Sequence, residues 1–165
     1  MDYFFKMIAS PVGELTLIAS EEGIAAVLWE NENPSRIRLK ANELANDFPL
    51  LRDAEKQLGE YFTGQRTQFS LKLAPEGTVF QRSVWQVLQQ IPYGETRSYQ
   101  QVAALAGYPR AVRAVGAANG RNPLSILVPC HRVIGANGKL TGFAGGLETK
   151  AFLLDLESGR HCFHI

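Results

Sequence analysis

The sequence predicts an α+β protein with two parts. Residues 1–75 are expected to form a small N-terminal α/β domain, an antiparallel sheet with helices, and residues 76–165 a helical C-terminal domain of winged-helix type. The first expectation rests on short alternating apolar runs between turn residues, which are typical of β-strands. The second rests on two short helical stretches joined by a glycine-bearing turn, the pattern of a helix-turn-helix. A chain of 165 residues can bury one or two hydrophobic cores.

The composition excludes several classes of protein. Hydrophobic residues make up 45% of the chain, so it is neither a disordered tail nor a fibre. No apolar run reaches the length of a membrane span, and the N-terminus lacks the features of a signal peptide. The two cysteines, Cys130 and Cys162, provide neither a disulfide framework nor a metal-binding spacing. We therefore expect a cytoplasmic protein without a metal, in a compartment that keeps thiols reduced.

In the N-terminal part, three strands are expected to form an antiparallel meander. They cover Tyr3 to Ala9, Leu15 to Ala19 and Ile24 to Trp29. We expect Ser35 to cap a helix that ends near Ala45, and Asp53 to cap a second helix. The stretch from Thr67 to Leu73 alternates like a further strand. No catalytic constellation lies here, so this part is expected to support the other.

The C-terminal part begins after a linker at Ala74 to Gly77. Thr78 is expected to cap a helix that runs to Ile91 and places Trp85 on its core face. Ser98 caps the next helix, and a third covers Ala111 to Asn119 after a turn. This third helix consists mostly of small residues. Such residues fit a narrow groove close to a sugar-phosphate backbone, and they equally allow two helices to pack closely.

Charge is distributed unevenly along the chain. Between Thr96 and Leu147 there is no Asp or Glu. Six of the 17 Lys and Arg residues lie in this stretch, which leaves 11 against 16 Asp and Glu residues elsewhere. An acid-free basic segment is typical of a phosphate-binding face, although a chance gap gives the same pattern.

The stretch from Asn122 to Gly135 is the centre of the sequence. We expect its apolar run, Leu124 to Val128, to be a buried strand or extended segment. Cys130 and His131 follow the strand end at Pro129, which places a thiol at the edge of a core. The thiolate is the reactive form, so a base such as His131 is needed nearby. Neighbouring side chains of an extended segment point to opposite faces, so contact requires a kink or a bridging water. Taken alone, the pair also fits a buried structural cysteine beside a surface histidine.

Three features follow this stretch. Residues 135–139 contain Asn137-Gly138 and are expected to form a hairpin-type turn, the wing of a winged helix. Thr141 to Gly146 is a glycine-rich loop that matches no nucleotide-phosphate motif. A last helix begins at Leu147 or Glu148 and ends at Glu157.

Five sets of motifs occur in one order between about Phe80 and Gly159. They are Gly94-Glu95 with Ser98-Tyr99, Arg113-Ala114-Val115-Gly116-Ala117-Ala118-Asn119, Asn122-Pro123, Pro129-Cys130-His131-Arg132-Val133-Ile134-Gly135 and Gly142-Phe143-Ala144-Gly145-Gly146. Together they resemble the O6-alkylguanine-DNA alkyltransferases, also called methylated-DNA–protein-cysteine methyltransferases. The resemblance implies that O6-methylguanine, and O4-methylthymine as well, is flipped out of duplex DNA and gives its alkyl group irreversibly to Cys130 in a single turnover. It implies no cofactor, because the damaged DNA is the methyl donor.

The resemblance also implies roles for individual residues. Glu157 would orient His131, which takes the proton of Cys130. Tyr99 would protonate the leaving guanine, and Asn122 would hold the active-site backbone. Arg113 would fill the gap left by the flipped nucleotide. Further DNA contacts would come from Ala114, Ala118, Tyr99, Arg121 and Lys139, and the base pocket would be lined by Val133, Phe143 and Ala144.

Two other functions are compatible with parts of the sequence. One is a DNA-binding module that recognises alkyl lesions without transfer; such proteins lack the cysteine, so Cys130 argues against it. The other is a Cys-His thiol hydrolase, against which the acid-free basic segment and the helix-turn-helix pattern argue. The expected partner is double-stranded DNA that contains alkylated bases. We expect the protein to bind it as a monomer and not to associate with a membrane.

Overall fold

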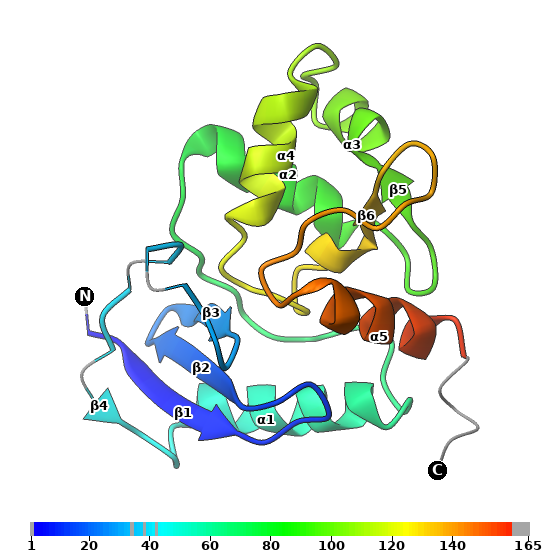
Figure 1. Cartoon of the computed structure of the whole chain (residues 1–165). Coiled ribbons are helices and arrows are strands. Elements are labelled where there is room, and N and C mark those ends of the chain that lie inside the picture. The colour runs from blue at the N-terminus through cyan, green and yellow to red at the C-terminus, as the bar shows by residue number, and fades with distance from the viewer. Residues whose placement is uncertain (1, 34, 38, 42, 160–165) are drawn as a thin grey trace.

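A four-stranded sheet forms the N-terminal part of the chain (Figure 1). The computed structural model describes residues 2–33, 35–37, 39–41 and 43–159. The strands lie in the order β3-β2-β1-β4 and cover Phe4–Ile8 (β1), Leu15–Ser20 (β2), Gly23–Leu28 (β3) and Glu43–Leu44 (β4). The predicted antiparallel meander of the first three strands is confirmed. The fourth strand was not predicted; it pairs parallel to β1, with Phe4 opposite Glu43.

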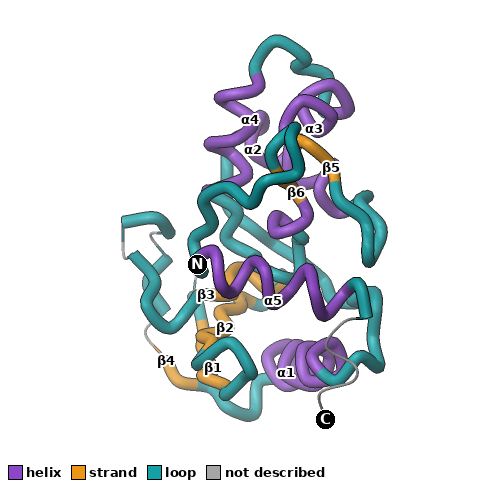
Figure 2. The backbone as a smooth tube through the Cα atoms, turned by 45° about the vertical axis from the view of Figure 1, so that its right-hand side comes forward, coloured by secondary structure: helices purple, strands orange, loops and turns teal. Residues whose placement is uncertain are grey.

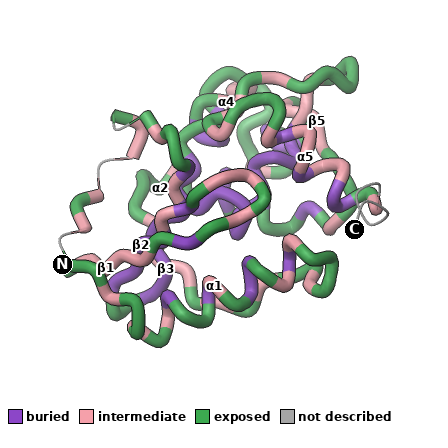
Figure 3. The backbone as a smooth tube through the Cα atoms, turned by 60° about the horizontal axis from the view of Figure 1, so that its bottom comes forward, coloured by how far each residue is buried: buried purple, intermediate pink, exposed green. Residues whose placement is uncertain are grey.

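Helix α1 (Pro49–Phe62) packs against β1, β2 and β3. In Figure 3 it alternates between buried and exposed residues, as an amphipathic helix does. Its buried face consists of Leu51, Ala54, Gln57, Leu58 and Tyr61. The predicted start at Asp53 is wrong. The helix begins four residues earlier because Pro49 occupies its first turn, where the missing N–H has no cost.

Two further predictions for this part are wrong. Residues 35–37 and 39–41 are turn and loop, not helix, and residues 38 and 42 lie outside the described residues. Ser35 does not cap a helix, because its own N–H and hydroxyl both donate to the Asn33 side chain. The stretch 67–73 is not a strand either; only Leu73 forms a bridge, to Ile24. Ser70 is held by a side chain instead of a neighbouring strand. Gln57 Nε2 donates to the Ser70 carbonyl, and Gln57 Oε1 accepts from Ser70 N–H.

The C-terminal part is helical, as predicted. Its helices are α2 (Val79–Gln89), α3 (Tyr99–Leu105), α4 (Val112–Gly120) and α5 (Leu147–Glu157), with a 3-10 turn at Cys130–Arg132. Thr78 and Ser98 cap α2 and α3, each in a complete capping box. The predicted helix-turn-helix is formed by α3 and α4, which contact each other. Trp85 is 3% exposed and donates to the Ala118 carbonyl, so it belongs to the core as expected.

The predicted wing is only partly formed. Strand β5 (Arg97–Ser98) pairs parallel with β6 (Val133–Ile134). The turn after β6 is closed by a hydrogen bond from Gly135 N–H to the Lys139 carbonyl, with Gly138 at φ 79°. Within the described chain no second strand follows Lys139, so the turn is not part of a regular hairpin.

The two parts are joined by packing as well as by the linker. Helix α5 runs between α1 and the other C-terminal helices in both Figure 1 and Figure 2. Buried residues of both parts belong to one hydrophobic cluster, and Val27 N–H of β3 donates to the Pro123 carbonyl at 2.8 Å. The boundary between residues 75 and 76 stays a prediction. No helix in the described ranges has the length and apolar character to cross a bilayer.

Candidate active site

The segment before the cysteine turns twice within a few residues. Leu127 N–H donates to the Ser125 carbonyl at 2.9 Å across Ile126, whose φ is 73°. A positive φ is rare for a β-branched residue, and a γ-turn of this hand is strained. The predicted buried strand or extended segment over 124–128 is therefore wrong in its conformation, although Leu124, Ile126 and Val128 are buried as expected.

The second turn sets the direction of Cys130. Its N–H donates to the Val128 carbonyl at 2.8 Å across Pro129, which has φ −81° and ψ 64°. These angles are those of the favourable inverse γ-turn. Cys130 and His131 then enter a 3-10 turn instead of an extended segment. The backbone therefore has a kink at Cys130 and His131, one of the two possibilities that the sequence allowed for contact between their side chains.

Asn122 fastens both ends of this loop. Its Nδ2 donates to the Val128 carbonyl and its Oδ1 accepts from Leu124 N–H, each at 2.9 Å. The side chain is 1% exposed. Because both bonds are buried, replacing Asn122 would leave Leu124 N–H without its side-chain partner, while the Val128 carbonyl would keep only the bond from Cys130 N–H. This placement fits the expected role of holding the backbone next to Cys130.

His131 and Glu157 form a buried pair. His131 Nε2 lies 2.6 Å from Glu157 Oε2, and the two residues are 0% and 5% exposed. With Nε2–H donating to the carboxylate, Nδ1 is the nitrogen left as a base. His131 Nδ1 is buried and has no hydrogen-bond partner among the described residues. His131 is buried, so the alternative interpretation of the pair as a structural cysteine beside a surface histidine is excluded.

Two other residues bind the same carboxylate, and the sequence indicated neither contact. Arg132 donates from Nε to Oε1 at 2.7 Å and from Nη2 to Oε2 at 3.0 Å. Its Nη1 donates to the Ile91 carbonyl. Tyr61, on α1, donates its hydroxyl to Oε2 at 2.6 Å. Arg132 is therefore the counter-ion of Glu157.

The surroundings set the protonation of the three groups. Burial raises the pKa of Glu157, but His131 and Arg132 outweigh it through hydrogen bonds and charge and lower this pKa to about 2. Burial lowers the pKa of His131, so the ring is neutral at pH 7. Burial raises the pKa of Cys130, opposed by the Asn122 amide and the charges of Arg36 and Lys150. The resting site thus holds a thiol, a neutral imidazole and a carboxylate.

Two cations near the thiol were missed in the sequence. Lys150 is fully buried, and its Nζ donates to the Val133 carbonyl at 2.6 Å. Arg36 binds Glu32 and donates to the carbonyls of Gly120 and Asn122. The i, i+4 spacing of Glu32 and Arg36 was a usable signal for an ion pair. Nothing in the sequence marked Lys150 as buried.

The predicted pocket residues lie at different depths. Phe143 is partly buried and packs edge-on against Trp29 of the N-terminal part, with ring centroids 5.5 Å apart. Ala144 is exposed. Val133 has no exposed surface, so it supports the site from the core and does not line an open pocket. Tyr99 is partly buried, and its hydroxyl lies 2.6 Å from Thr141 Oγ1.

Four of the six predicted DNA-contacting residues are exposed, whereas Tyr99 is partly buried and Ala118 is buried. Arg113, Ala114, Arg121 and Lys139 are exposed. Ala118 is 3% exposed because its face of α4 packs on α2, so the expectation that it contacts DNA does not fit the structure. The small residues of α4 therefore serve close helix packing on one face, while the face with Arg113 and Ala114 remains available.

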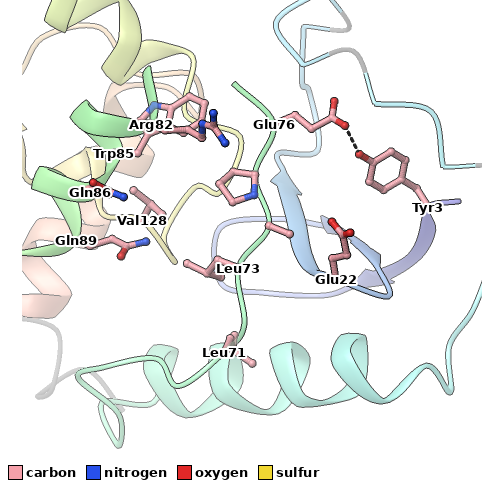
Figure 4. Close-up of a pocket in the computed structure, with 12 residues that line it drawn as sticks. Tyr3, Glu22, Leu71, Leu73, Glu76, Arg82, Trp85, Gln86, Gln89 and Val128 are labelled. Atoms are coloured by element: carbon pink, nitrogen blue, oxygen red, sulfur yellow. Dashed lines mark hydrogen bonds between the residues drawn. The ribbon is translucent and has the colours of Figure 1, made fainter. Parts of the chain in front are cut away.

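A large hollow in the described structure lies away from these residues. This cavity of about 600 Å³ lies between the linker and α2. Figure 4 shows Glu22 and Glu76 on one side and Arg82 on the other, with Tyr3 bonded to Glu76. None of the predicted site residues lines it.

Among the described residues, no group of three or more His, Cys, Asp and Glu could hold a metal ion. Cys162 lies outside the described residues.

A buried thiol, adjacent in the chain to an imidazole–carboxylate pair on a fold with a helix-turn-helix, is the arrangement expected of a protein that combines a reactive cysteine with a DNA-binding type of fold. Comparison with known families agrees with this class. Residues 3–75 match the family described as 6-O-methylguanine DNA methyltransferase, ribonuclease-like domain. Residues 79–159 match 6-O-methylguanine DNA methyltransferase, DNA binding domain. The chain belongs to the 6-O-methylguanine DNA methyltransferase family.

Individual relatives are similar over almost their whole length. The methylated-DNA–protein-cysteine methyltransferase of Methanosarcina barkeri is 50% identical over 154 residues, which are 93% of this chain and 96% of that protein. The constitutive enzyme of Bacillus subtilis is 48% identical over 156 residues, 93% and 94% of the two chains. The crystal structure of Mycobacterium tuberculosis OGT in complex with DNA superimposes with a TM-score of 0.82 at 45% identity, covering 97% of this chain and 94% of that one. The predicted family and fold class are confirmed.

Proposed function

We propose that this protein repairs alkylated DNA by moving the alkyl group of O6-methylguanine, and of O4-methylthymine, onto Sγ of Cys130 in a single turnover. Its relatives are named for methyl transfer from DNA to a protein cysteine. The observation that supports the assignment to Cys130 is its place next to His131 in the chain, where His131 is bound to the buried Glu157 and its Nδ1 has no partner among the described residues.

The neutral imidazole supports a proton relay. His131 Nδ1 takes the proton of Cys130 through a water molecule, and Glu157 stabilises the resulting imidazolium. The sulfur then attacks the methyl carbon, a C–S bond forms, and the bond from that carbon to O6 breaks with its electron pair moving to guanine. The thioether product has no route to hydrolysis, so each molecule acts once.

The leaving base and the DNA engage the exposed groups. Guanine accepts a proton at ring N3 from the Tyr99 hydroxyl, and both Tyr99 and His131 return to their resting state by exchange with solvent. Arg113 projects from the exposed face of α4 and fills the gap left by the flipped nucleotide. Lys139 and Arg121, both exposed, bind phosphates without reading sequence. The partner is double-stranded DNA with alkylated bases. We further propose that the protein binds it as a monomer in the cytoplasm, where the thiol stays reduced.

The experiment mixes purified protein with a duplex that carries one O6-methylguanine, followed by intact mass measurement and peptide mapping. We expect a gain of one methylene unit, confined to Cys130 and saturating at one per molecule. Cys130→Ala is the control; it should bind the duplex and gain no mass. DNA binding without any adduct on the wild-type protein would favour a binding module instead. Neither binding nor adduct, with turnover of a small acyl substrate, would favour a thiol hydrolase.

A further inference from the structure

The N-terminal part of the chain reaches the catalytic pair through one hydroxyl group. Tyr61 lies on α1 with no exposed surface, and its hydroxyl donates to Glu157 Oε2 at 2.6 Å. His131 Nε2 contacts this same oxygen, also at 2.6 Å. The contact joins α1 to α5, which lie next to each other in Figures 1 and 2.

We propose that Tyr61 is a positioning residue for alkyl transfer, which acts through Glu157 and sets how strongly His131 holds the proton taken from Cys130. This inference rests on the function proposed above. It gives the N-terminal part a share in the chemistry, although that part contributes no reacting group.

The hydroxyl is held in its donating form. Burial and the charge of Glu157 both raise the pKa of Tyr61, so it remains protonated wherever the site works. Oε2 receives three donors, from Tyr61, His131 and Arg132 Nη2, whereas Oε1 receives Arg132 Nε alone. Each donor draws electron density from the oxygen, so Oε2 attracts the proton on His131 less strongly than it would without Tyr61. The charged or titratable groups around His131 are Glu157, Arg132 and Lys150, with Cys130 adjacent in the chain.

Removing the hydroxyl therefore has a definite sign. In Tyr61→Phe the carboxylate becomes more basic, the imidazolium is better stabilised, and the pKa of His131 rises. Because the neutral ring is the base, the acidic limb of the rate profile then moves to higher pH. A hydroxyl that only packs would lower stability and leave this limb in place. The ring contacts of Tyr61 with Phe62 and Phe69 are kept in the variant.

The test measures methyl transfer from an excess of O6-methylguanine duplex in single turnovers, from about pH 5 to about pH 8. We expect the acidic limb of Tyr61→Phe to lie about half a unit to one unit above that of the wild type. Tyr93→Phe is the matched control. It removes a hydroxyl from the same aromatic cluster, but that hydroxyl donates to the Leu156 carbonyl at 3.4 Å. Its limb should coincide with the wild-type limb; coinciding limbs for all three proteins would overturn the inference.

A second variant covers the case in which Tyr61→Phe fails to fold. Incorporation of 3-fluorotyrosine at position 61 keeps the ring and makes the hydroxyl more acidic and a stronger donor. The limb should then move to lower pH, opposite to the phenylalanine variant. An unchanged or raised limb would refute the role of Tyr61 while the wild type still transfers methyl groups. A wild-type protein that gains no methyl group at any pH would instead refute the proposed function.

Discussion

Glu157→Gln should lower the free energy of unfolding by a large amount, because the Glu157 carboxylate accepts hydrogen bonds from four buried donors. Two come from Arg132, one from Tyr61 and one from His131. An amide offers one acceptor oxygen and turns an N–H toward at least one of these donors. It also leaves Arg132, 6% exposed, without its counter-ion. Breaking a buried ion pair from one side costs roughly 3–5 kcal/mol.

The shifted pKa gives a separate estimate of the same loss. The pKa of Glu157 falls from its ordinary 4.5 to about 2 in the folded protein. At 1.36 kcal/mol per unit this amounts to about 3 kcal/mol. A lowered folded pKa means that the contribution is complete above about pH 4.5 and is lost as the pH falls toward 2. The deficit of Glu157→Gln should therefore be largest near neutral pH and shrink in acid.

Urea unfolding at several pH values measures both features. The control is Glu60→Gln, which breaks a half-exposed pair with Arg66 at 2.9 Å. Surface pairs of this kind contribute about 0.2–1 kcal/mol, so the control should lose little at any pH. A deficit of Glu157→Gln below about 1 kcal/mol at neutral pH, or one that does not change with pH, would refute the reasoning.

Three further predictions concern the site. Asn122→Ala should lose roughly 1–3 kcal/mol in urea unfolding, because Leu124 N–H loses its buried partner and the Val128 carbonyl loses one of its two donors, and an unchanged midpoint would contradict this. Arg113→Ala should slow transfer from duplex DNA far more than from an unpaired lesion, because only the duplex leaves a gap to fill when the nucleotide flips; equal slowing on both substrates would remove Arg113 from the flipping step. The wild-type transfer rate should stay level from neutrality down past pH 6.5, since burial lowers the pKa of His131 from 6.5 and the neutral ring is the base. A profile already falling above that pH would show that this assignment is wrong.

The elements that could be predicted from the sequence are those with local signals. Thr78 and Ser98 cap their helices as expected, and each also forms a capping box with the glutamine three residues later. The strands of the meander follow alternating patterns, and the last helix ends at Glu157 as expected. The motif around Cys130 indicated the pairing of His131 with Glu157 through its resemblance to a family, because nothing local connects residues 26 positions apart.

The parts that failed depend on contacts distant in sequence. The apolar run 124–128 reads as a strand, but its two γ-turns are held by Asn122 and by the bond between Val27 and Pro123. Ser35 resembles a helix cap, yet neighbouring Arg36 is drawn to carbonyls at the end of α4, more than 80 positions away. From the sequence alone, Lys150 resembles a solvated charge on a surface helix. In the structure it is buried, because its Nζ donates to the Val133 carbonyl, 17 positions earlier in the chain.

These distant contacts change how the N-terminal part should be understood. It was expected to support the site, but three of its residues touch the machinery directly: Tyr61 reaches Glu157, Arg36 reaches the carbonyl of Asn122, and Trp29 packs on Phe143. A side chain added at Gly145 would also meet the Trp29 ring, with a Cβ 2.8 Å from its nearest ring atom. Because these contacts hold Glu157, the loop before Cys130 and Phe143 respectively, loosening the N-terminal part would disturb all three. The active site is therefore assembled by both parts of the chain, even though the thiol, the base and the carboxylate all come from the C-terminal one.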